Sequence, residues 1–88
     1  MTNLGIMIVD DHQMVIDGIK SMLVNESYIQ LVAEANDGEA AMQILAQQSE
    51  HINFVISDIS TPVRNGTELC KRIKQQYPSI SVLFLSMY

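Results

Sequence analysis

The fold is decided by the stretch at residues 6–11, IMIVDD, in which four apolar residues run directly into Asp10 and Asp11. A second apolar run, Phe54–Ser57, ends in Asp58 in the same way. Short apolar runs of this kind are typical of strands buried in a parallel sheet. In an open α/β sheet, function collects outside the carboxyl ends of the strands, where the strand order reverses. If both runs are strands, the three carboxylates meet at one edge of the sheet.

Strand-like and helix-like segments alternate along the chain, which favours an α/β fold with a parallel sheet. We predict strands at Leu4–Val9, Gln30–Ala35, Asn53–Ser57 and Ile80–Leu85. We predict helices at Met14–Leu23, from the cap signature at 36–39 onward, and from Asn65 until Pro78 stops the third helix. In the signature at 36–39, Asn36 or Asp37 is the N-cap and Glu39 is in position to complete a capping box.

The composition narrows the classes of function. A chain of 88 residues makes one small domain. Ten acidic against five basic residues give a net charge of −5, which argues against nucleic-acid binding through this segment because such binding needs cationic side chains. Four of the five bases fall within residues 64–74, where they form either a solvated helix face or a face for a partner.

Cysteine use and hydropathy bear on the cellular setting. Cys70 is the only cysteine, so the chain has no internal disulfide, which fits a reducing, cytoplasmic compartment. No apolar run approaches the roughly 20 residues that span a bilayer, and no basic-then-apolar leader precedes the domain. We therefore expect a cytoplasmic protein without a membrane partner.

Three converging carboxylates suit a hard divalent cation and an aspartate that accepts a phosphoryl group. Other interpretations exist for each residue alone. Asp10 and Asp11 can serve as acidic N-cap residues of the next helix, and aspartates such as Asp58 are common in loops after strands. Together the acids would repel one another, a cost that a bound divalent ion removes. The Ser86 hydroxyl is either a phosphoryl ligand or a surface serine, and His12 is better interpreted as a helix-start histidine than as a ligand.

With these residues in place, the chain resembles the receiver domain of two-component response regulators, in the subgroup with a LuxR-type helix-turn-helix output domain. The resemblance is carried by Ile8–His12, Val15, Gly18-Ile19, Asn36–Ala40, Asp58, Pro62, Gly66, Leu69–Lys74, Tyr77-Pro78 and Ser86. It implies a flavodoxin-like, doubly wound parallel sheet in the order 2-1-3-4. It also implies that residues 1–88 are an incomplete receiver domain, without the fifth strand, the last two helices and the output domain.

The resemblance assigns roles to individual residues. Asp58 is the phosphoacceptor, which takes its phosphoryl group from a sensor histidine kinase, and Ser86 is the switch hydroxyl. Asp11 and Asp58 ligate Mg²⁺ through carboxylates, Ser60 through its backbone carbonyl and Asp10 through a bound water. Such a domain is not an enzyme in its own right; it controls transcription through its output domain. The family's lysine at the end of a fifth strand has no counterpart in this chain, and Thr61 and Arg64-Asn65 also depart from the usual pattern.

Two other functions stay open from the residues alone. One is an aspartate-nucleophile phosphatase of the dehalogenase type, although that family places a second acid where this chain has Ser60. The other is an interaction module on the same scaffold without phosphorylation. If the sheet order is 2-1-3-4, Ile80–Leu85 makes an apolar, uncharged edge strand, so we expect the 88-residue chain to self-associate.

Overall fold

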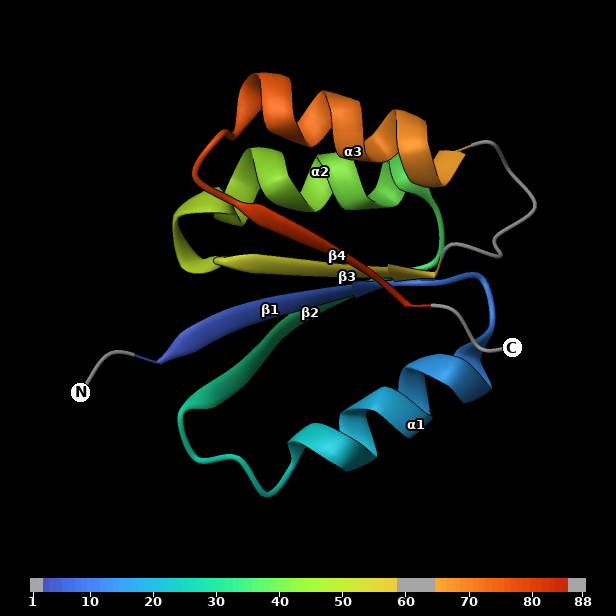
Figure 1. The fold of residues 1–88 in the computed structure, drawn as a ribbon, viewed down its shortest axis with the longest axis vertical. Helices are drawn as coiled ribbons and strands as arrows, with labels where there is room; N and C mark the ends of the chain where they lie inside the picture. Colours follow the sequence, from blue (N-terminus) through green and yellow to red (C-terminus); the bar gives the residue numbers. More distant parts are fainter. Residues whose placement is uncertain (1–2, 59–64, 86–88) are drawn as a thin grey trace.

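Four parallel strands form one sheet in the order β2-β1-β3-β4 (Figure 1). The computed structural model describes residues 3–58 and 65–85. The strands are β1 at Leu4–Val9, β2 at Ile29–Ala35, β3 at Phe54–Asp58 and β4 at Ser81–Leu85. This is the strand order predicted above, and it places β1 and β3 side by side at the centre of the sheet.

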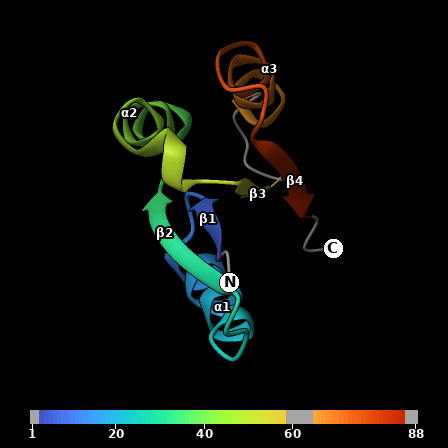
Figure 2. The same cartoon turned by 90° about the vertical axis from the view of Figure 1, so that its left-hand side faces the viewer.

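The helices cover both faces of the sheet, as a doubly wound fold requires (Figures 1 and 2). Helix α1, at Gln13–Leu23, lies on one face. Helices α2, at Gly38–Gln48, and α3, at Asn65–Gln76, lie together on the other. A short 3₁₀ helix, η1 at Ser49–His51, joins α2 to β3 and was not predicted from the sequence.

Each face of the sheet has its own hydrophobic core, because successive strand residues point to opposite sides. In β1, Ile6 and Ile8 pack toward α1, whereas Met7 and Val9 pack toward α2 and α3. The core on the α1 side is formed by Ile6, Ile8, Ile16, Ile19 and Ile56. The core on the other side is larger and includes Met7, Val9, Ala35, Ala41, Met42, Leu45, Ile52, Val55, Leu69, Ile73 and Ile80.

Strand β2 contains one extra residue. Its register with β1 steps from the pair Ile6–Leu31 to the pair Met7–Ala33, so that Val32 is inserted as a β-bulge. Beyond the bulge, Glu34 is paired with Ile8 and lies on the α1 face. There its carboxylate lies 2.8 Å from the Lys20 ammonium of α1. The hydrogen bond from Lys20 to Glu34, and the charge of that carboxylate, raise the pKa of Lys20 above its ordinary value.

The start of α2 differs in part from the prediction. Asp37 is the N-cap, and its carboxylate accepts a hydrogen bond of 2.8 Å from the backbone N–H of Ala40. Glu39 is then the second helical residue rather than the third, so the predicted capping box is wrong. Glu39 instead accepts a hydrogen bond of 3.0 Å from Arg72 Nη1 and links α2 to α3.

The start of β3 also differs, because Asn53 stands just before the strand rather than in it. Its N–H donates to the Gly5 carbonyl at 2.7 Å, and its side-chain Oδ1 accepts from the Gly5 N–H at 2.8 Å. Asn53 therefore bonds both the N–H and the carbonyl of Gly5 in β1, through its side chain and its backbone, without being a strand residue.

Two of the four clustered basic residues make contacts within the fold. Arg72 pairs with Glu39, and Lys74 Nζ donates to the Ile80 carbonyl at 3.3 Å. Lys71 is exposed on α3, and Arg64 lies outside the described residues. Over residues 3–58 and 65–85, no helix is long and apolar enough to cross a bilayer.

Candidate functional site

The register of β1 and β3 aligns the ends of the two central strands. Val9 is paired with Ser57, so Asp10 and Asp58 are the next residues along two neighbouring strands. Adjacent strands lie about 4.8 Å apart, so the backbones of these two residues leave the sheet side by side. Asp58 is described through its backbone alone, as the last residue of β3.

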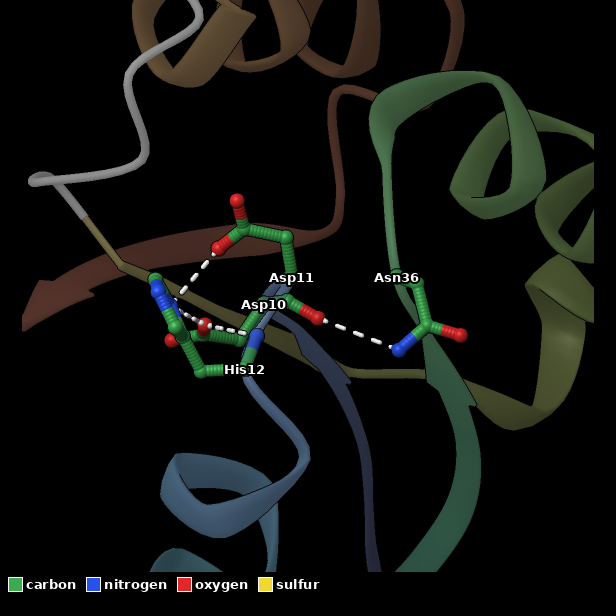
Figure 3. Close-up of polar contacts among 4 residues, drawn as sticks. All are labelled: Asp10, Asp11, His12 and Asn36. Carbon is green, nitrogen blue, oxygen red and sulfur yellow. Dashed lines mark hydrogen bonds and ion pairs between the residues drawn. The ribbon is translucent and has the colours of Figure 1, made fainter.

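Asp10 and Asp11 are brought together where β1 leads into α1 (Figure 3). The side chain of Asp10 is 1% exposed and that of Asp11 is 37% exposed. The Nδ1 atom of His12 lies 3.1 Å from an Asp10 carboxylate oxygen and 2.8 Å from an Asp11 carboxylate oxygen. When protonated, the imidazole therefore offsets part of the repulsion between the two carboxylates.

The acid pair is not the N-cap of α1, which was the structural alternative for these residues. His12 occupies the N-cap position, and its side chain makes no capping hydrogen bond. The Asp10 carboxylate accepts a hydrogen bond of 2.8 Å from the His12 backbone N–H, before the helix begins. The two carboxylates are thus held at the edge of the sheet, outside the helix.

The main chain of Asp10 is fixed from the end of β2. Its N–H donates to the Ala35 carbonyl at 3.0 Å, and its carbonyl accepts a hydrogen bond of 3.3 Å from Asn36 Nδ2 (Figure 3). The sequence suggested Asn36 only as a possible helix cap. The signal available in the sequence was its position directly after a strand that ends at the same edge of the sheet as Asp10.

Three further residues of the predicted site cannot be placed. Ser60 and Ser86 lie outside the described residues, as does Pro62. Leu85, which directly precedes Ser86 in the chain, is paired with Asp58. The edge of the sheet that carries Asp10 thus continues through Asp58 to the end of β4.

The donor chemistry at this edge fits a hard divalent cation. Asp10, Asp11 and His12 each offer a ligand atom, and these atoms lie within 4.8 Å of one another. Mg²⁺ prefers carboxylate and carbonyl oxygens and keeps several waters. Two adjacent carboxylates supply such oxygens, whereas the His12 nitrogen is better suited to softer metals.

Comparison with known proteins supports the resemblance to the receiver domain. Residues 6–88 match the model of the response regulator receiver domain. The chain belongs to this family. The receiver domain is 35% identical over 83 residues to the transcriptional regulatory protein DegU of Brevibacillus brevis, covering 94% of this chain and 34% of DegU. It is 34% identical over 90 residues to the transcriptional regulatory protein RcsB of Salmonella typhi, covering 99% of this chain and 41% of RcsB.

Solved structures agree with this assignment. The non-phosphorylated receiver domain of the stress response regulator RcsB from Escherichia coli superposes with a TM-score of 0.84 at 31% identity, covering 99% of this chain and 67% of that one. An RcsB–DNA complex superposes with a TM-score of 0.86 at 31% identity, covering 99% of this chain and 44% of that one. The predicted family and flavodoxin-like fold are confirmed. The receiver domain spans less than half the length of the curated relatives.

Proposed function

We propose that this receiver domain accepts a phosphoryl group on the carboxylate of Asp58 from a sensor histidine kinase. The observation that carries the proposal is the pairing of Val9 with Ser57, which sets Asp10 and Asp58 next to each other at one edge of the sheet. Three aspartates at one edge of a sheet are a poor arrangement unless a cation and an anionic group bind there. Family membership supports the same function.

In the proposed reaction, a carboxylate oxygen of Asp58 attacks phosphorus and the bond from phosphorus to the kinase's histidine nitrogen breaks. The electron pair of that bond stays with the imidazole, and an acyl phosphate remains on Asp58. Asp11, Asp58 and the Ser60 carbonyl would hold Mg²⁺ directly, and Asp10 would hold it through a bound water. When bound, the ion neutralises negative charge on the phosphoryl oxygens. The Ser86 hydroxyl donates a hydrogen bond to one of those oxygens.

The output of this reaction lies beyond the receiver domain. DegU and RcsB are named as transcriptional regulatory proteins, and the chain spans only 34% and 41% of their lengths. We assign control of transcription to an output domain outside this segment, whose net charge of −5 does not suit DNA. The module acts as a phosphoacceptor in the cytoplasm and not as an enzyme with turnover.

Labelling with acetyl phosphate and Mg²⁺ tests the assignment of Asp58. We expect intact-mass spectrometry to show one added phosphoryl group on a fraction of the wild-type protein and none in Asp58→Asn. The labelling should be weak or short-lived, because residues 1–88 hold no counterpart of the family's lysine to compensate the phosphoryl oxygens. Asp17→Asn, which changes an exposed carboxylate of α1, is the matched control and should be labelled like the wild type. Modification that survives in Asp58→Asn would contradict the proposal. Absence of labelling in every variant would favour the interaction module, and turnover of a phosphomonoester would favour the phosphatase.

We also propose that the 88-residue chain self-associates through β4. This strand is an edge of the described sheet, it pairs with β3 over five consecutive residues, and Leu83 on it is 49% exposed. Sedimentation across a concentration series should show dimers or larger species that are reduced in Leu83→Lys, because a charge on an edge strand opposes pairing. A clean monomer at tens of micromolar would contradict this.

A further inference from the structure

The amide side chain of Asn36 reaches across the end of the sheet to a peptide group that carries the acid pair. Asn36 directly follows β2, and its Nδ2 donates to the Asp10 carbonyl at 3.3 Å (Figure 3). That carbonyl belongs to the peptide bond between Asp10 and Asp11. Because a peptide unit is planar, a hydrogen bond that fixes the carbonyl also fixes the direction in which the chain enters Asp11.

The position of Asn36 is itself fixed on both sides. The carbonyl of Ala35 accepts from the Asp10 N–H at 3.0 Å, and Asp37 is the N-cap of α2. Asp37 rather than Asn36 accepts the hydrogen bond from Ala40. The Asn36 side chain is therefore not needed to cap α2. Because the backbone on both sides of Asn36 is ordered, less conformational entropy is lost when its side chain binds the Asp10 carbonyl.

Asp11 is the member of the acid pair that needs this support. The Asp10 side chain is buried, whereas that of Asp11 is 37% exposed, with its oxygen against the exposed ring of His12. An exposed carboxylate on a loop must be oriented through its backbone if it is to bind a cation in near-ideal geometry. The contact from Asn36 is made one peptide unit before Asp11, where it restrains that backbone.

We propose that Asn36 is a positioning residue for the acid pair, which holds the peptide between Asp10 and Asp11 so that the Asp11 carboxylate is preorganised for Mg²⁺. This inference rests on the proposed function of the edge. It predicts a role in cation affinity for a residue that does not touch the cation. Outer residues that orient metal ligands typically change affinity by 10- to 100-fold when mutated. We expect the low end of that range, about 10-fold, because Asn36 acts on the backbone and not on the carboxylate itself.

The test uses the 88-residue chain and Asn36→Leu, which keeps the branching of the side chain but removes its donor. Mg²⁺ titration followed by ¹H–¹⁵N NMR should show a dissociation constant about 10-fold higher than in the wild type. Asn36→Gln retains an amide donor and should recover part of the loss. Asn25→Leu, at an exposed asparagine between α1 and β2, is the matched control and should bind Mg²⁺ like the wild type.

A second measurement is made without Mg²⁺. In the wild type, a coupling through the hydrogen bond should join Asn36 Nδ2 to the Asp10 carbonyl carbon. That carbon's resonance should move upfield in Asn36→Leu, while the carbonyl carbon of Tyr28, which accepts from the Leu4 N–H and is distant in sequence, stays in place. Equal Mg²⁺ affinity in wild type and Asn36→Leu, an equal loss in Asn25→Leu, or absence of the coupling in the wild type would overturn the inference. If the coupling is present but the wild type neither binds Mg²⁺ nor is labelled by acetyl phosphate, it is the proposed function that fails. The coupling needs no variant, so its absence overturns the inference even if Asn36→Leu does not fold; in that case Asn36→Gln, with a Mg²⁺ affinity equal to that of the wild type and no coupling, would overturn it as well.

Discussion

Glu34 of β2 meets Lys20 of α1 at 2.8 Å because the bulge at Val32 turns Glu34 toward the α1 face of the sheet. This ion pair links β2, an edge strand of the described sheet, to helix α1. Both side chains are partly exposed, so solvent screens their attraction and its contribution to stability is small.

The pH dependence of this pair is predictable in sign. The Glu34 carboxylate raises the pKa of Lys20 above the ordinary 10.5. The pair therefore contributes stability below pH 10.5, and that contribution is lost as the pH rises through the higher pKa of the folded state. Urea unfolding should show Lys20→Met less stable than wild type at pH 7, with the difference shrinking above pH 10.5. Lys71→Met, at an exposed lysine of α3, is the control for loss of a lysine and should change the stability little at pH 7.

Binding of Mg²⁺ should stabilise the fold through the acid pair. A ligand that binds only the native state at 100 times its dissociation constant adds about 2.7 kcal/mol to the free energy of unfolding. Thermal unfolding of the wild type should therefore shift upward in millimolar Mg²⁺, and Asp11→Ala should lose the shift. Asp17→Ala should keep it. If Mg²⁺ raised the unfolding temperature of Asp11→Ala as much as that of the wild type, the ion would not bind at the acid pair.

Replacement of Gly5 and of Gly18 by alanine should change the free energy of unfolding in opposite directions. A Cβ on Gly5 would collide with the backbone carbonyl of His51 and lie 3.0 Å from Val32 Cγ2, so Gly5→Ala should destabilise by about 1–3 kcal/mol. A Cβ on Gly18, within α1, meets no described atom within 4 Å, so Gly18→Ala should stabilise by about 0.5–1 kcal/mol. Urea unfolding of both variants gives the two free energies. A neutral Gly5→Ala would mean that η1 does not pack on β1 as described.

The N-cap of α2 can be assigned by mutation. Asp37→Ala removes the acceptor for the Ala40 N–H and should cost about 1 kcal/mol in free energy of unfolding, measured in urea. Asp37→Ser retains an acceptor and should recover most of it. A loss in Asp37→Ala that Asp37→Ser does not recover would contradict the assignment of the cap to Asp37.

The strands were predictable because each is a short apolar run with a sharp polar boundary. The bounds of β1 agree with the prediction, Leu4–Val9, and β2 begins one residue earlier than predicted, at Ile29. The bulge at Val32 was not predictable, since Val32 and Ala33 are both small apolar residues and a run of apolar residues does not reveal where its alternation slips.

The candidate site was predictable as a set of strand ends and not as a set of contacts. Two apolar runs ending in acids were enough to bring Asp10 to the edge where β3 ends. The contacts of His12 with both carboxylates, and of Asn36 with the Asp10 carbonyl, depend on how two loops turn after their strands. Loop geometry of that kind follows from tertiary packing, which no local pattern encodes.

The central place of β1 has a consequence for synthesis of the chain. Strand β1 leaves the ribosome before both of its neighbours, β2 and β3, so its pairing is incomplete until the segment ending at Asp58 has emerged. During that interval the run Ile6–Val9 is uncharged, apolar and without its second neighbour, which are properties of segments that aggregate. Substitutions that delay the docking of β3 should therefore lower the yield of soluble protein in cells more than they lower the equilibrium stability of the purified fold.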